Sequence, residues 1–155
     1  MLSQRSRYAL KALLHLAADE TGAPVSIGSI AHATGISRKF LEAILNDLRR
    51  EGVVDSARGK LGGYKLALPA SEISFARVIR ASEGPLALFP CASVNFYRPC
   101  ADCEVETCTL RKVLARARES VAAVLEGTSL ASARHDGHEG AAPFGDLVDE
   151  DRASS

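Results

Sequence analysis

A basic, glycine-rich loop between two short apolar segments constrains the fold of this chain most strongly. The loop is Arg58-Gly59-Lys60-Leu61-Gly62-Gly63, and Val53-Val54 precedes it. After the loop, Tyr64, Leu66 and Leu68 alternate with Lys65 and Ala67, a period of two that is typical of a half-buried strand. Glycines supply the backbone freedom that a tight turn needs, so the segment predicts a β-hairpin.

Three helices are expected before this hairpin. Tyr8, Leu13 and Leu16 mark the first one, which begins at Ser3 or Ser6. Serine is a preferred N-cap, so Ser26 predicts the start of a second helix, which ends at Gly35, and Ser37 the start of a third, which ends before Gly52. The apolar face of the third helix is Phe40, Leu41, Ile44, Leu45 and Leu48.

Two helices joined by a glycine-containing turn and followed by a basic hairpin form a winged helix-turn-helix, which binds double-stranded DNA. The charge distribution agrees, because residues 1–65 hold ten Lys/Arg against six Asp/Glu, whereas residues 131–155 hold two against six. Basic and polar side chains at the start of the third helix and in the loop are the candidate DNA contacts: Ser37, Arg38, Lys39, Arg58 and Lys60.

The second half of the chain adds an irregular segment and a long helix. A short helix around Phe75, Val78 and Ile79 ends at Gly84-Pro85. In the long helix the apolar residues step by 4, 3, 4 and 3, which is the heptad spacing of a helix that packs against a partner helix. These residues are Leu110, Leu114, Ala117, Val121 and Val124. The alternative is that this stripe covers the core of its own domain; we favour a homodimer, because the winged helix already has a core.

The expected fold is therefore mostly α with a small β-hairpin wing, a winged helix-turn-helix plus a long dimerisation helix. The expected parts are a DNA-binding domain at 1–84, a cysteine-rich loop at 85–107, a dimerisation helix at 108–128 and a disordered acidic tail at 129–155.

All four cysteines lie within 18 residues, in the spacing C-x8-C-x2-C-x4-C. They are Cys91, Cys100, Cys103 and Cys108. Thiolates so close together can enclose an iron–sulfur cluster, either 2Fe–2S or 4Fe–4S, or a zinc ion. A redox disulfide is a third interpretation, and idle cysteines are a fourth, which so tight a grouping disfavours.

Other classes of function find less support. No nucleophile–base pair and no paired carboxylates suggest catalysis, so no enzyme is expected. No apolar run could span a bilayer and the N-terminus does not resemble a signal peptide, so we expect a cytoplasmic protein without membrane contact. A small iron–sulfur carrier is the alternative from another class, but it would have no use for a basic, glycine-rich hairpin.

Several segments resemble the Rrf-type winged-helix regulators, a family that includes the IscR, NsrR and RirA types. They are Tyr8-Ala9-Leu10, Ile30-Ala31, residues 40–45 and 48–52, the wing from Ser56 to Leu66, and Cys108-Thr109-Leu110. The resemblance covers about residues 1–128. It implies a dimeric DNA-binding regulator that senses iron, redox or nitric oxide status through a cysteine-ligated cluster. By resemblance, Glu42 and Arg58 match positions that read DNA.

The cysteine pattern departs from that family, whose cluster-binding members usually have three cysteines and a fourth ligand of another type. In some members this ligand is a histidine three residues after the last cysteine, where this chain has Arg111. In others it is an aspartate of the other subunit's first helix, where this chain has Arg7. Neither arginine can ligate a metal, so we predict an all-cysteine site within one subunit.

Overall fold

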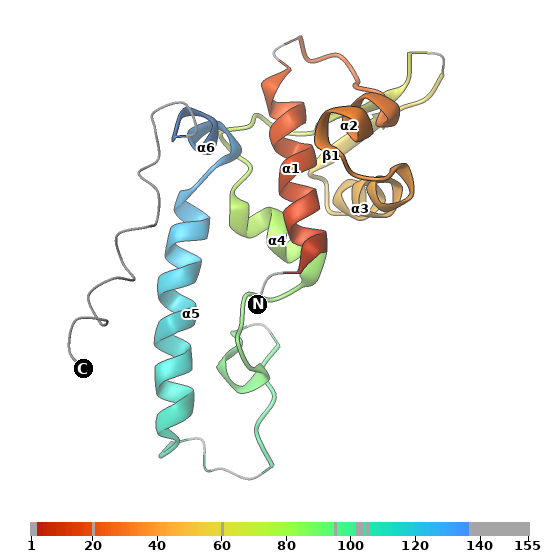
Figure 1. Ribbon diagram of the computed structural model, residues 1–155. Helices are drawn as coiled ribbons and strands as arrows, with labels where there is room; N and C mark the ends of the chain where they lie inside the picture. The colour runs from red at the N-terminus through yellow and green to blue at the C-terminus, as the bar shows by residue number, and fades with distance from the viewer. Residues whose placement is uncertain are drawn as a thin grey trace, which may run out of the picture.

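The computed structural model describes residues 3–19, 21–59, 61–94, 96–101, 104 and 106–136. Its elements are α1 (Gln4–Ala18), α2 (Ile27–Thr34), α3 (Arg38–Arg50), β1 (Val54–Ala57), β2 (Gly63–Leu66), α4 (Phe75–Glu83), the 3-10 turn η1 (Pro90–Ala92), α5 (Thr109–Gly127) and α6 (Leu130–Asp136). Helices dominate, and β1 and β2 form an antiparallel hairpin (Figure 1). The predicted fold class, a winged helix-turn-helix with a long additional helix, is confirmed.

Local sequence signals begin and end the first three helices. Ser3, Ser26 and Ser37 are their N-caps, and each side chain accepts a hydrogen bond from a backbone N–H two or three residues later. Gly35 ends α2 in the left-handed conformation, with φ of 70°, which costs a glycine little. The next residue, Ile36, is buried and fills the turn between α2 and α3.

The core of the winged-helix head, by which we mean α1 to α4 with the hairpin, is built from aliphatic side chains at helical spacing. Its largest fully buried members are Leu13, Ile30, Leu41, Ile44, Leu45, Leu48, Val53, Val54, Ile73, Val78 and Ile79, with Leu130 from α6. The expectation for α3 holds except at Phe40, whose ring is 60% exposed. Because that ring packs in a T-shaped arrangement with the ring of Tyr8 of α1, with centroids 6.2 Å apart, Phe40 lies at the border of the core.

The base of the wing is fixed to the segment that precedes α2. Val25 and Tyr64 exchange two backbone hydrogen bonds of 2.9 Å, which form an isolated antiparallel bridge beside β2. At the neighbouring Gly63 an added Cβ would lie 2.2 Å from the carbonyl oxygen of Val25. Only glycine permits so close an approach of two backbones, so Gly63 sets where the wing leaves the head.

The structure corrects the expectation that a tail begins at residue 129. Residues 130–136 form α6, and Leu130 is fully buried in the core of the head. The backbone N–H of Leu130 donates to Ile73 at 2.9 Å, and the guanidinium of Arg134 donates to the carbonyl of Ala17. The expected tail of residues 137–155 lies outside the described residues.

Leu130→Ala is expected to lower the free energy of unfolding by about 2–5 kcal/mol, because Leu130 is fully buried and its truncation leaves a cavity in the core. Chemical denaturation followed by circular dichroism measures this change. His135→Ala, at an exposed position of the same helix, is the matched control and should change stability by less than about 0.5 kcal/mol. Equal stability of the two variants would show that α6 is not part of the folded head.

The end of α4 is joined to the start of α1 by a cluster of hydrogen bonds. The Glu83 carboxylate accepts from the backbone N–H of Ser3 at 2.7 Å, from the Ser3 hydroxyl at 2.6 Å and from the buried hydroxyl of Ser6. Partial burial by itself raises the pKa of Glu83, but these hydrogen bonds outweigh it and hold the pKa below its usual value. At Gly84, with φ of 91°, the chain turns away from the head.

Candidate DNA interface and cysteine site

The candidate DNA contacts of α3 lie in its first turns. Arg38, Lys39 and Glu42 are all exposed. The hydroxyl of Ser37 is occupied as the N-cap and accepts from the Phe40 N–H at 3.4 Å. The guanidinium of Arg38 lies over Gly28 of α2, where an added Cβ would be 2.7 Å from it.

The wing carries Arg58 directly after the end of β1. Arg58 is exposed and precedes Gly59, whose φ of 107° places it in a region that favours glycine. A side-chain hydrogen bond of 3.3 Å from Arg49 of α3 to Ser56 of β1 links the helix to the hairpin. Lys60, the second basic residue expected in the wing, lies outside the described residues.

Sequence reasoning missed Phe40 as a surface residue. Its spacing from Ile44 is that of a core position, and only the fold reveals that α1 leaves most of the ring exposed. An exposed aromatic residue in the first turn of α3 is a further candidate contact, since aromatic side chains can contact a thymine methyl group.

Three of the four candidate ligands lie in described parts of the cysteine segment, which we define as residues 85–108. Cys91 is in η1 and only 6% exposed, and Cys100 is exposed in the loop that follows. Cys108 is half-buried and is the N-cap of α5, where its sulfur accepts from the Arg111 N–H at 3.4 Å. Cys103 lies outside the described residues.

The thiols of this segment influence one another. Burial raises the pKa of the Cys91 thiol, and a hydrogen bond to Cys100 together with the charges of Cys100 and Cys108 raises it further. Cys91 therefore stays protonated to a higher pH than an isolated thiol. A cation that binds here would supply the positive charge needed to release its proton.

No set of three His, Cys, Asp or Glu side chains that could hold a metal ion occurs within the described residues. The donor chemistry nonetheless fits a thiolate-bound centre, because Cys91 and Cys100 interact and Cys108 caps a helix N-terminus, where the helix dipole favours an anion. Arg111 contacts two of these cysteines, because its guanidinium donates to the carbonyl oxygen of Cys91 and its backbone N–H donates to the sulfur of Cys108. The chemistry of the described cysteines is therefore consistent with a site of four cysteine ligands, which stays a prediction.

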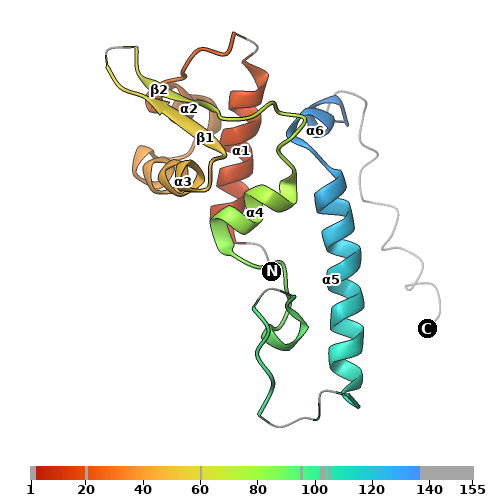
Figure 2. The same ribbon diagram turned by 180° about the vertical axis from the view of Figure 1, so that it is seen from behind.

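The cysteine segment and α5 extend together from the head (Figures 1 and 2), and α5 contacts both η1 and α4. No residue of α5 is buried. Four apolar side chains are more than half exposed and define what we call the α5 apolar face: Leu110, Val113, Val121 and Val124. Of the predicted seam, Leu114 and Ala117 are half-buried instead, and Val113 is a member that the heptad spacing missed.

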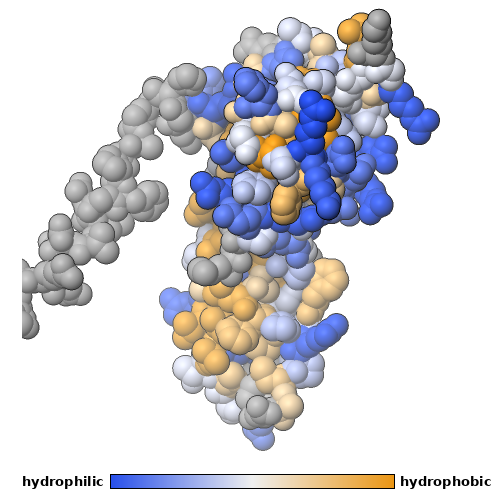
Figure 3. Space-filling model, turned by 45° about the vertical axis from the view of Figure 1, so that its right-hand side comes forward, coloured by the Kyte–Doolittle hydropathy of each residue, from blue (hydrophilic) through white to orange (hydrophobic). Residues whose placement is uncertain are grey.

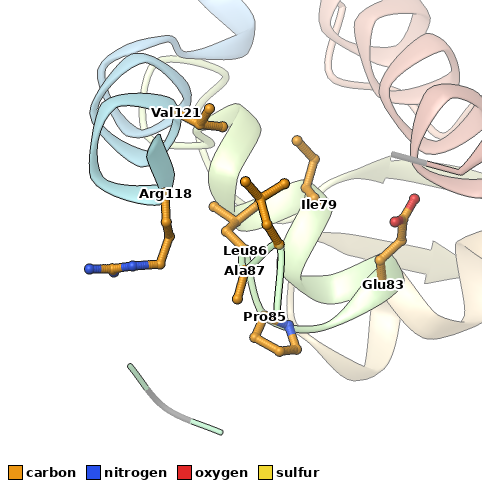
Figure 4. Close-up of a pocket in the computed structure, with 8 residues that line it drawn as sticks. Ile79, Glu83, Pro85, Leu86, Ala87, Arg118 and Val121 are labelled. Carbon is orange, nitrogen blue, oxygen red and sulfur yellow. The ribbon is translucent and has the colours of Figure 1, made fainter. Parts of the chain in front are cut away.

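On the side shown in Figure 3, hydrophobic side chains cover much of the part below the head, whereas the head is mostly hydrophilic around a smaller hydrophobic area. A cavity of about 320 Å³ lies between α4, residues 85–88 and α5. Its centre is apolar, with Ile79, Leu86 and Val121 around it, while the charged ends of Glu83 and Arg118 point away (Figure 4). The cavity and the α5 apolar face together leave one side of the single chain uncovered.

No helix among the described residues combines the length and the apolar content needed to cross a membrane.

Comparison with known proteins identifies the family. The family model named Rrf2, described as "Iron-dependent Transcriptional regulator", matches residues 2–136. A Rhodobacter capsulatus protein named as an rrf2-like transcriptional regulator of the HTH type is 40% identical over 134 residues, which cover 84% of this chain and 89% of that protein. A Mycobacterium tuberculosis protein named as an HTH-type transcriptional regulator is 38% identical over 133 residues, which cover 84% of this chain and 78% of that protein.

Two solved structures share the fold at 30% identity. CymR (YrzC), described as the global cysteine regulator of B. subtilis, superposes with a TM-score of 0.72 and covers 87% of this chain and 96% of its own. T. potens IscR superposes with a TM-score of 0.70, and the match covers 90% of this chain and 89% of that protein. These relatives are transcriptional regulators and not enzymes, which confirms the expectation from sequence and sets aside the iron–sulfur carrier. The chain belongs to the Rrf2 family of DNA-binding transcriptional regulators.

Proposed function

We propose that this protein is a homodimeric transcriptional regulator that senses iron, redox or nitric oxide status through an iron–sulfur cluster in the cysteine segment. The observation that supports this most is the setting of Cys91 and Cys108. One lies in η1 and the other caps α5, and Arg111 contacts both, so two cysteines 17 positions apart in sequence are held at one end of α5.

The residues that would hold the cluster are Cys91, Cys100, Cys103 and Cys108. Four thiolates suit both a 2Fe–2S and a 4Fe–4S cluster. Such a cluster supplies a centre whose charge and ligation change with iron supply, oxidants or nitric oxide. The chain's own part is to gather the thiolates at the N-terminus of α5 and to connect them to the head through Gly84 and Glu83.

The proposed DNA interface comprises Ser37, Arg38, Lys39 and Glu42 of α3 with Arg58 and Lys60 of the wing. Glu42 can accept a hydrogen bond from cytosine N4 in the major groove, whereas Arg58 suits the narrow minor groove beside it. The exposure of Arg38, Lys39, Glu42 and Arg58 supports this assignment. A homodimer presents two such heads to double-stranded operator DNA.

Arg58→Ala and Glu42→Ala are expected to affect DNA binding in different ways. Loss of Arg58 should weaken operator binding, because it removes a cation from a region of strong negative potential. Loss of Glu42 should relax base preference, at a cost in discrimination of about 1–3 kcal/mol at one base pair. Operator selection followed by sequencing, with titrations at fixed salt, measures both effects.

Arg116→Ala on α5, which removes an exposed arginine distant from the candidate interface, is the matched control for Arg58→Ala. An unchanged consensus at unchanged stringency for Glu42→Ala would remove Glu42 from the interface.

A zinc-stabilised or thiol-switched regulator is the second candidate, and the interaction of the Cys91 and Cys100 thiols favours it. A visible absorption spectrum of anaerobically purified protein, with iron, sulfide and zinc content per subunit, separates the candidates. Broad absorption at about 400 nm with iron and sulfide is the result expected of the cysteine-ligated cluster. Colourless protein with one zinc per subunit, or with no metal and a reversible disulfide, would replace the cluster proposal.

A further inference from the structure

Arg111 makes three contacts that reach three different parts of the cysteine segment. Its side-chain Nε donates to the carbonyl oxygen of Cys91 at 3.0 Å. Its guanidinium lies over the ring of Tyr97, 5.6 Å from the ring centroid. Its backbone N–H donates to the sulfur of Cys108 at 3.4 Å. One residue of α5 thus joins η1, the following loop and the helix N-terminus.

The loop that Arg111 holds is already closed on itself. The N–H of Arg98 donates to the carbonyl of Pro90 at 3.2 Å, and the N–H of Phe96 donates to the hydroxyl of Ser93 at 3.1 Å. These bonds bring the loop back beside η1 before it reaches Cys100. Arg111 contacts this closed loop at two points, the carbonyl of Cys91 and the aromatic ring of Tyr97. Two contacts fix the orientation of the loop relative to α5 as well as its distance from α5.

We propose that Arg111 is a positioning residue that holds Cys91 and Cys108 in the relative placement that the cysteine-ligated centre requires. The inference rests on the proposed function only for the identity of that centre. Arg111 is not a ligand, since a guanidinium has no lone pair to donate to a metal. Its role also differs from neutralising thiolate charge, which a cation in any orientation would do.

Geometry and charge can be separated by substitution. Arg111→Lys keeps the positive charge but lacks the Nε–H and the planar group that covers Tyr97. Arg111→Gln removes the charge as well. Tyr97→Leu keeps an apolar side chain but removes the ring. Lys112→Gln, which removes one charge at the adjacent exposed position of α5, is the matched control.

The first measurement uses reduced protein without metal and follows alkylation of each cysteine by iodoacetamide with mass spectrometry. In the parent, Cys91 is buried and should react slowly, while the exposed Cys100 reacts fast and serves as an internal reference. Arg111→Lys and Arg111→Gln should both accelerate the alkylation of Cys91 about tenfold, because the side-chain contacts that hold η1 and the loop against α5 are lost. Tyr97→Leu should accelerate it in part. Lys112→Gln should leave all rates unchanged.

The second measurement uses anaerobically reconstituted protein and compares visible circular dichroism and iron and sulfide content. Both Arg111 variants should show an altered dichroic spectrum or lowered content, with the far-ultraviolet spectrum of the head unchanged. The positioning role would be overturned if Cys91 were alkylated at the same rate in the parent and in all variants. It would also be overturned if Arg111→Lys had the parental alkylation rate and the parental dichroic spectrum. If the parent takes up no iron and sulfide, the proposed function fails, but the alkylation rates still decide the role of Arg111.

Discussion

Val121→Glu is expected to convert the proposed dimer into monomers and to abolish high-affinity binding to the operator. Val121 is 51% exposed on the α5 apolar face of the single chain. In the proposed dimer this face is covered, so the new carboxylate would lose its hydration without gaining a partner. A two-fold interface contains the substitution twice, and about 2 kcal/mol per copy raises the dimer dissociation constant about a thousandfold.

Analytical ultracentrifugation across a concentration series measures this constant, and a titration with operator DNA follows its consequence. Ala123→Glu is the matched control, because it adds the same charge to the same helix at an exposed position about 200° around the axis from Val121. It should leave the dimer intact. Dimeric Val121→Glu with parental DNA affinity would show that the subunits meet elsewhere.

Removal of any one cysteine is expected to lose most of the iron and sulfide of the reconstituted protein. If all four thiolates are ligands, alanine at Cys91, Cys100, Cys103 or Cys108 leaves an open coordination position and a centre that oxidises readily. Iron and sulfide per subunit should fall to a small fraction of the parental value in each of the four variants. Thr107→Ala, an exposed substitution next to Cys108, should retain full content.

The spacing also allows a site with only three cysteine ligands. Cys100 and Cys103 then compete for the middle position, and a residue such as Glu104 or a side chain of the partner subunit completes the set. Full parental content in the Cys100→Ala or the Cys103→Ala variant would establish that arrangement and would contradict the four-cysteine site.

Much of the head could be predicted because its signals are local. Serine N-caps and glycines at helix ends act within a few residues, and the helical period of Leu41, Ile44 and Leu48 reports directly which face is buried. Helix α6 escaped this reasoning because its place in the fold depends on one leucine, Leu130, in a run rich in small and polar residues. A single apolar side chain produces no periodic pattern, so only the fold shows that Leu130 completes the core.

The candidate site was harder to predict, because its contacts are not local. Cysteine spacing indicated a common site but could not indicate that the loop folds back through Pro90 and Arg98. The hydrogen bond from Arg111 to the Cys91 carbonyl spans 20 residues and follows no repeat. Heptad spacing likewise assigned Leu114 to the seam and omitted Val113, since it does not register which side of α5 rests on its own subunit.

The path of the chain around α4 has a consequence for how the two halves of the molecule communicate. The chain leaves α4 at Gly84 and returns at its first residue, where the N–H of Phe75 donates to the carbonyl of Thr128 at 2.9 Å. The cysteine segment and α5 therefore form one continuous excursion of the chain, which leaves the head at one end of α4 and returns to it at the other. The two ends are separated by the nine residues of α4, about 13 Å. Such an excursion can change in length without displacing the head. A rigid rotation of the excursion, by contrast, applies torsion to α4. Helix α4 packs against both α1 and α3, the helix that carries four of the proposed DNA contacts.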